Sequence, residues 1–77
     1  NVYPNPFKNE VYVSLSLLES ENTSLRLTDI NGKMQMEQLL EHNNHLHRID
    51  LEHLNSGVYF LTLQADDFVK TVRIVKQ

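Results

Sequence analysis

The chain has 77 residues and lacks cysteine and tryptophan, and it holds only two glycines and two prolines. Without cysteine, neither a disulfide nor a thiolate metal site is available to stabilise it. A chain of this length buries only about 60% of the surface that its unfolded form exposes. Its stability therefore depends on strand pairing and on a well-filled apolar interior.

Long runs of one residue type are missing as well. The ten acidic and seven basic residues give a formal charge of −3 and are interspersed, so a basic surface for nucleic acid is not expected. No apolar run approaches the roughly 18 residues of a transmembrane helix, and the first residues do not show the charged-then-apolar pattern expected of a signal peptide. The length fits one domain, and because the first residue is not methionine, we expect residues 1–77 to be a processed product or the tail of a longer protein.

Six segments alternate between apolar and polar residues, the pattern of a strand with one buried face. They cover residues 10–18, 24–30, 33–41, 45–51, 57–65 and 68–76. In the third segment the alternation breaks at Leu39-Leu40, which indicates a bulge or bend, and residues 37–41 could instead form a short helix. Pro4 and Pro6 mark residues 1–6 as an entry segment or short edge strand. The pattern favours an all-β sandwich.

The period of two also divides the apolar residues between two faces. The residues expected to face inward are Val11, Val13, Leu15, Leu17, Leu25, Leu27, Ile49, Leu51, Tyr59, Leu61, Leu63, Ala65, Val72 and Ile74. Val58 and Phe60 fall on the outer face, where Phe68 would join them if the last two strands pair. Such a cluster marks either a partner surface or the ordinary scatter of exposed apolar side chains.

The stretch from Leu54 to Tyr59 resembles the corner of immunoglobulin-like β-sandwiches, where a tyrosine near a strand start bonds upstream backbone. We expect the Tyr59 ring to fill the core and its hydroxyl to bond a backbone group near Leu54. Gly57 is expected to serve the backbone geometry of this corner. The sequence therefore predicts an immunoglobulin-like fold.

Four histidines raise the question of a metal site. His42, His45, His47 and His53 lie in one stretch, and two of them, His45 and His47, would share a strand face. Two imidazoles can bind zinc or copper, but a third ligand is needed. A polar edge facing solvent is the favoured interpretation, and we expect no metal and no other cofactor.

Catalytic patterns are also missing from the sequence. Adjacent residues of a strand face opposite ways, so Asp66-Asp67 fits a hairpin turn better than a carboxylate pair. No G-x-S-x-G and no D-x-D-x-D-G run is present, which argues against a nucleophile elbow and a calcium loop. We therefore expect a protein that is not an enzyme.

With these features, the chain resembles the C-terminal sorting domain of the type IX (Por) secretion system of Gram-negative bacteria. The resemblance rests on Pro4, Asn5 and Pro6 at the opening, Asp29, Gly32 and Lys33 in a central hairpin, Leu54, Gly57 and Tyr59 at the corner, and the basic and apolar residues 72–77 at the end.

The resemblance implies a seven-stranded immunoglobulin-like antiparallel β-sandwich that acts as an address. Such a domain is recognised in the periplasm, directs its cargo through the outer-membrane translocon, and is then removed by a cell-surface sortase. The cargo ends at the cell surface or is secreted. By analogy, Lys70, Val75, Lys76 and Gln77 carry the signal in an accessible tail. An exposed edge strand would also permit strand addition by a partner or a strand-paired dimer.

The alternative function is an accessory carbohydrate-binding or adhesive module. Such a module needs an exposed aromatic platform. With Tyr59 assigned to the core, the plausible members are Tyr3, Tyr12, Phe60 and Phe68.

Overall fold

The computed structural model describes residues 2–14, 22–41, 46–65 and 68–77, and in these ranges it contains seven β-strands and no helix. The strands are β1 (Val2–Tyr3), β2 (Glu10–Ser14), β3 (Asn22–Asp29), β4 (Met34–Glu41), β5 (Leu46–Asp50), β6 (Gly57–Ala65) and β7 (Phe68–Lys76). The described part of the chain thus contains no helix that could cross a membrane.

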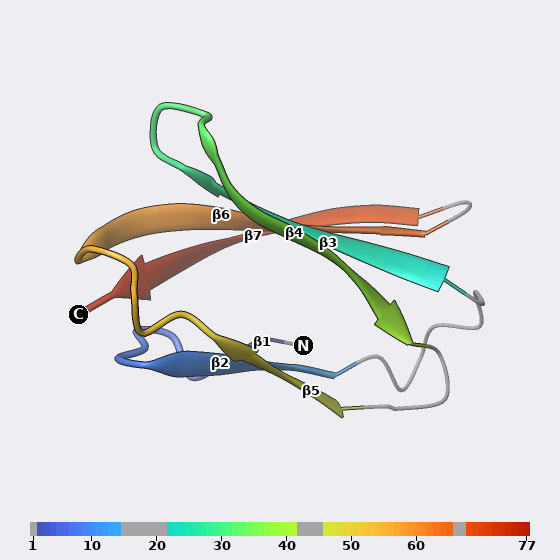
Figure 1. Cartoon of the computed structure of the whole chain (residues 1–77), viewed down its shortest axis with the longest axis horizontal. Coiled ribbons are helices and arrows are strands. Elements are labelled where there is room, and N and C mark those ends of the chain that lie inside the picture. The colour runs from blue at the N-terminus through green and yellow to red at the C-terminus, as the bar shows by residue number, and fades with distance from the viewer. Residues whose placement is uncertain (1, 15–21, 42–45, 66–67) are drawn as a thin grey trace.

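The strands form two antiparallel sheets that pack face to face (Figure 1). One sheet has the order β1-β2-β5, and the other has the order β4-β3-β6-β7. The sequence-based prediction of a seven-stranded immunoglobulin-like antiparallel β-sandwich is confirmed. Residues 1–6 contribute the short edge strand β1, and β6 and β7 have the predicted bounds.

The predictions for the third segment need correction. The helix alternative for residues 37–41 is wrong, because β4 pairs with β3 along its whole length. The expected bulge at Leu39-Leu40 is also wrong, since these residues stay in regular register with β3. Leu39 is simply an exposed leucine, while Leu40 is buried. The register shifts instead at the other end of β4, where Thr28 lies opposite Met34 and Leu27 lies opposite Met36.

The core lies between the two sheets and uses the predicted inward positions. Its buried members are Phe7, Val11, Val13, Leu25, Leu27, Leu40, Ile49, Leu51, Leu54, Tyr59, Leu61, Leu63 and Ile74, with Val72 and Phe68 packed against them. The inward packing of Phe68 corrects the prediction that it joins Phe60 on the outer face: Phe68 lies opposite buried Ala65. The predictions for Leu15, Leu17 and the Asp66-Asp67 turn concern positions outside the described residues.

Candidate functional site

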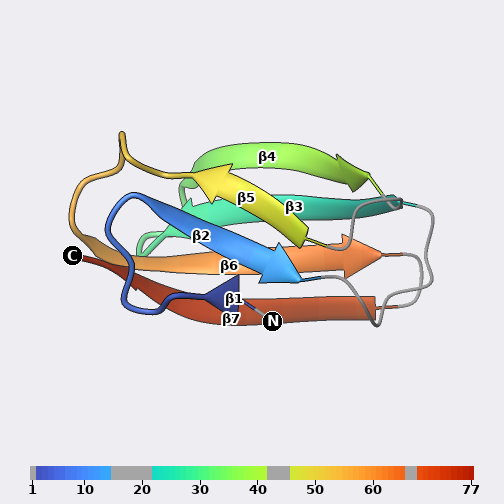
Figure 2. The same cartoon turned by 90° about the horizontal axis from the view of Figure 1, so that it is seen from below.

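The opening segment of the chain is fastened to the last strand. The Asn5 side-chain amide donates to the Arg73 carbonyl (2.9 Å), and its amide oxygen accepts from the Val75 backbone N–H (3.0 Å). Two residues on, Phe7 donates to the Val75 carbonyl (2.9 Å) and accepts from the Gln77 N–H (2.8 Å). Figure 2 shows the turn between β1 and β2 at the same end of the molecule as the C-terminus. The Pro4-Asn5-Pro6 motif therefore covers the edge of β7 along residues 73–77.

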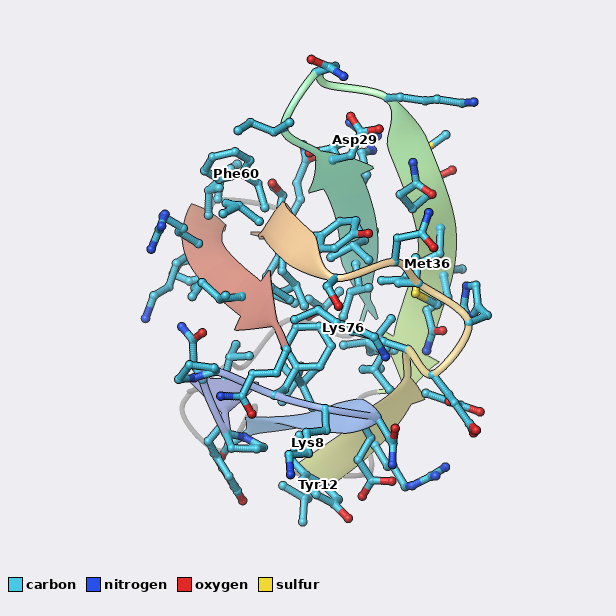
Figure 3. The ribbon with its side chains drawn as sticks, turned by 90° about the vertical axis from the view of Figure 1, so that its left-hand side faces the viewer. Lys8, Tyr12, Asp29, Met36, Phe60 and Lys76 are labelled. Atoms are coloured by element: carbon cyan, nitrogen blue, oxygen red, sulfur yellow. The ribbon has the colours of Figure 1, made fainter. Side chains whose placement is uncertain are left out.

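Lys76 joins three parts of the chain at this end of the sandwich. Its side chain points inward and lies between the two sheets (Figure 3). The Nζ ammonium donates to the carbonyls of Leu51 (3.0 Å), Glu52 (3.3 Å) and Lys8, and it lies 5.8 Å from the centre of the Phe7 ring. A buried cation is tolerated here because carbonyl oxygens and an aromatic face replace the water that it loses.

The four residues predicted to carry the sorting signal differ in their exposure to solvent. Lys70 and Gln77 are exposed and Val75 is half-buried, whereas Lys76 is only 8% exposed. The expectation of a fully accessible tail is therefore wrong for Lys76, whose ammonium is used inside the fold. Cross-strand pairing puts Lys70 and Lys76 on the inner face of β7 and Val75 on the outer face.

A shallow open groove of about 410 Å³ adjoins this junction. Its lining includes Pro4, Pro6, Lys8, Asn9 and Gln77, so the opening motif and the end of the chain share one surface. Sequence reasoning treated these two motifs as separate. It also missed Phe7, for which the only signal was an aromatic residue directly after the second proline.

The central hairpin motif is organised by Asp29. One carboxylate oxygen, Oδ1, accepts from the backbone N–H groups of Asn31 and Lys33, both at 2.9 Å, while Oδ2 accepts from the Gln35 side chain at 3.2 Å. Gly32 has a φ of +85°, the left-handed region that glycine adopts without steric cost. Asp29, Gly32 and Lys33 therefore shape a turn, and the motif has a structural explanation.

The tyrosine corner is present as predicted. The Tyr59 hydroxyl donates to the Asn55 carbonyl (2.6 Å), four residues upstream, and its ring is buried with Leu54. Gly57 has a φ of +152° and opens β6 directly after the corner. Leu54, Gly57 and Tyr59 thus hold the crossing from one sheet to the other.

Tyr59→Phe is expected to lower the free energy of unfolding by about 0.5–1.5 kcal/mol, the net contribution of one hydrogen bond. Thermal unfolding followed by circular dichroism measures this, since 1 kcal/mol shifts the midpoint by about 4–8 °C in a domain of this size. Tyr3→Phe is the matched control, because Tyr3 is exposed, and its change should stay within about 0.5 kcal/mol. Equal midpoints for the two variants would contradict the corner assignment.

A polar and aromatic row crosses the outer face of the three-stranded sheet. Tyr3 stacks on Tyr12 with ring centres 5.8 Å apart, and Arg48 lies opposite Tyr12 on the other side. The Tyr12 hydroxyl donates to Glu10, which also pairs with Arg48 at 2.7 Å. The hydrogen bond from Tyr12 lowers the pKa of Glu10, with help from Arg48, and the same bond raises the pKa of Tyr12.

The four predicted platform residues do not share one surface. Tyr3 and Tyr12 lie on the outer face of the three-stranded sheet, and Phe60 lies on the outer face of the other sheet. Phe68 packs toward the core. Only the stacked tyrosine pair is left for the carbohydrate-binding alternative.

Among the described residues, no group of three or more His, Asp or Glu side chains is arranged to hold a metal ion. His47 is half-buried on β5 and His53 is exposed, whereas His42 and His45 lie outside the described residues. The pairing of His45 with His47 therefore stays untested.

These features define a small β-sandwich whose last strand is held by the opening segment and by the loop that follows β5. Family comparison makes the assignment more specific. The chain belongs to the family described as the secretion system C-terminal sorting domain, whose model matches residues 1–77. No curated protein matches the chain.

Membership in this family indicates the function of the domain. It is a C-terminal sorting signal of type IX secretion, in a family that is not an enzyme family. A sorting signal of this type implies that the domain interacts with the secretion system and that the protein is exported to the cell surface or into the medium.

Proposed function

We propose that residues 1–77 form a single domain at the end of a larger secreted protein and act as its address. The cargo passes through the periplasm, the type IX translocon moves it across the outer membrane, and a cell-surface sortase then removes the domain. The observation that carries this proposal is the family match over the whole chain. The fastening of β7 by Asn5, Phe7 and Lys76 supports it, because a folded domain then presents its last strand in one fixed form.

Within this signal, we assign different roles to the four residues at the end of the chain. Lys70 and Gln77 are exposed and Val75 is half-buried, so their side chains are available to a partner. Lys76 instead stabilises the fold, because its ammonium bonds the loop between β1 and β2 to the loop that follows β5. A variant of Lys76 therefore tests stability before it tests recognition.

The sorting function is tested by export of a reporter fused in front of the 77 residues and directed to the periplasm. In a host with a working type IX translocon, we expect the reporter at the cell surface or in the medium. The same fusion in a translocon-deficient host, and the reporter without the domain, should stay in the periplasm. Periplasmic retention of the complete fusion in the working host would overturn the proposal.

Sortase removal is tested in the same fusion by the size of the delivered product. We expect the delivered reporter to lack the domain in a host with the sortase and to retain it in a host without one. Delivery of an uncleaved reporter in both hosts would show that the domain is an address that stays attached.

The carbohydrate-binding alternative retains one supporting observation, the stacked Tyr3–Tyr12 pair beside Arg48 and Glu10. Aromatic faces flanked by charged groups are a common lining of ligand sites. Titration of neutral and acidic oligosaccharides, followed by tyrosine fluorescence, separates the two functions. The sorting function predicts no change in fluorescence, whereas a change that Tyr3→Ala removes would favour the alternative.

A further inference from the structure

The outer face of the four-stranded sheet carries apolar side chains where β6 and β7 pair. Val58 lies opposite Val75, and Phe60 lies opposite Arg73. Directly opposite residues of an antiparallel pair project from the same face, so Val58, Phe60, Arg73 and Val75 form one surface, which we call the Phe60 face. Figure 1 shows no other strand of the described chain over this side of the sheet.

Two features distinguish the Phe60 face from ordinary surface. Its three apolar side chains are half-buried, so part of each remains accessible to solvent. On the adjoining strand β3, Thr28 lies opposite Phe60, and exposed Met34 of β4 lies opposite Thr28. The outer surface thus continues from the Phe60 face through Thr28, a polar residue, to the exposed Met34.

The charge of the last strand is opposite to that of the rest of the domain. Residues 68–77 contain Lys70, Arg73 and Lys76 and no acidic residue, a formal charge of +3, which leaves −6 on residues 1–67. Lys76 is buried, and among the described residues neither of the two ion pairs involves Arg73. Arg73 therefore presents a guanidinium beside the apolar side chains of the Phe60 face.

The edge of β7 along residues 73–77 is a poorer candidate for recognition. Asn5 and Phe7 already occupy backbone groups of Arg73, Val75 and Gln77. A partner strand could add there only after the opening segment had been displaced. Strand addition along residues 73–77 is therefore disfavoured in the folded domain.

From these observations, we propose that the Phe60 face is the docking surface for a protein of the secretion machinery. Its partner surface has an apolar centre rimmed by carboxylates, which complement the Arg73 guanidinium. The acidic remainder of the domain would repel these carboxylates and so disfavours other orientations of the domain on its partner. Phe60 and Val58 belong to β6, so the recognised surface includes residues well before the end of the chain. This inference rests on the sorting function proposed above.

The test is charge reversal in the complete reporter fusion. Arg73→Glu is expected to reduce the delivered reporter by about tenfold or more, because a like charge would face the carboxylate rim. Lys8→Glu makes the same change of charge on the other side of the molecule, as Figure 3 shows, and should leave delivery unchanged. Arg73→Lys should retain most of the delivery.

Phe60→Thr tests the apolar centre, because threonine keeps strand propensity and removes the ring. We expect a loss similar to that of Arg73→Glu. Thermal unfolding of each purified domain shows whether the variants are folded, and the Arg73→Glu midpoint is expected within a few degrees of the parent, roughly the shift of an ordinary surface change.

The outcomes separate the two proposals. Delivery of folded Arg73→Glu and Phe60→Thr fusions at the parent level would overturn the Phe60 face and leave the sorting function intact. Failure of the parent fusion to leave the periplasm would overturn the sorting function, and the docking surface with it. Loss of delivery in these two folded variants, with Lys8→Glu and Arg73→Lys delivered, supports the inference.

Discussion

Phe7→Ala is expected to lower the free energy of unfolding by about 3–5 kcal/mol, the usual cost of removing a buried aromatic ring. The ring is 1% exposed and belongs to the core between the sheets. Domains gain roughly 0.05–0.15 kcal/mol per residue, so a chain of this length has on the order of 4–12 kcal/mol in total. The substitution is therefore expected to remove a large share of the stability of the fold.

Chemical denaturation with urea measures this loss as a shift of the unfolding midpoint. Leu39→Ala is the matched control, because Leu39 is 71% exposed on β4. Its effect should stay within about 0.5 kcal/mol. If the two variants unfolded at the same urea concentration, Phe7 would not be the core residue that joins the opening segment to the sandwich.

Lys76→Met is expected to lower the free energy of unfolding by about 1.5–3 kcal/mol, the range for a hydrogen-bonded charged group. Methionine keeps the apolar stem but cannot donate to the three carbonyls that Nζ contacts. Lys8 and Glu52 are exposed residues, so their carbonyls can turn to water. Leu51 is fully buried, and its carbonyl loses the charged donor while it keeps the bond from the Leu54 backbone N–H at 3.2 Å. The desolvation that methionine avoids reduces the loss but does not cancel it.

Lys70→Met provides the control within the same strand. Lys70 faces the same side of β7 as Lys76 but is exposed, so the identical substitution should change stability by no more than about 0.5 kcal/mol. Thermal unfolding of both variants, compared with the parent domain, decides the matter. Equal midpoints for Lys70→Met and Lys76→Met would show that the buried ammonium contributes nothing to the fold.

The role of Lys76 changes how truncations at this end should be interpreted. Removing Lys76 and Gln77 takes away the ammonium contacts, the last pair of the β6–β7 ladder and the Gln77 bond to Phe7. A truncated fusion is then expected to be less stable, so a loss of delivery would not by itself identify recognised residues. Single exposed variants, such as those of Arg73 and Lys70, separate recognition from stability.

Local pattern was sufficient for much of the fold. Strict alternation in β6 and β7 predicted their exact bounds and the inward positions of Leu61 and Ile74, because a strand with one buried face must repeat every second residue. The leucine, glycine and tyrosine of the corner likewise predicted the Tyr59 hydroxyl bond. The family resemblance extended this reading to the sorting function, which the match over the whole chain bears out.

The sequence pattern did not predict which face some apolar side chains occupy, because an exposed apolar residue cannot be distinguished from a buried one by its type. Leu39 seemed to interrupt the alternation of β4 because a leucine is usually buried, yet it projects from the outer face of the sheet into solvent, opposite Ser24. Phe68 was predicted to lie on the outer face, but it faces inward because strand pairing places it opposite buried Ala65. Neither exposure nor register is encoded in the immediate neighbours of these residues.

The sequence by itself determined the strands, the corner and the family to which the chain belongs, because period, turn residues and short motifs are local properties. Only the tertiary structure brought Asn5, Phe7 and Lys76 together. Lys76 is about seventy positions from Asn5 and Phe7 in the sequence, and the contacts of these two residues with β7 exist only when β7 lies beside the opening segment. Tertiary structure also placed Phe60 next to Arg73, since strand pairing rather than sequence distance decides which side chains share a surface.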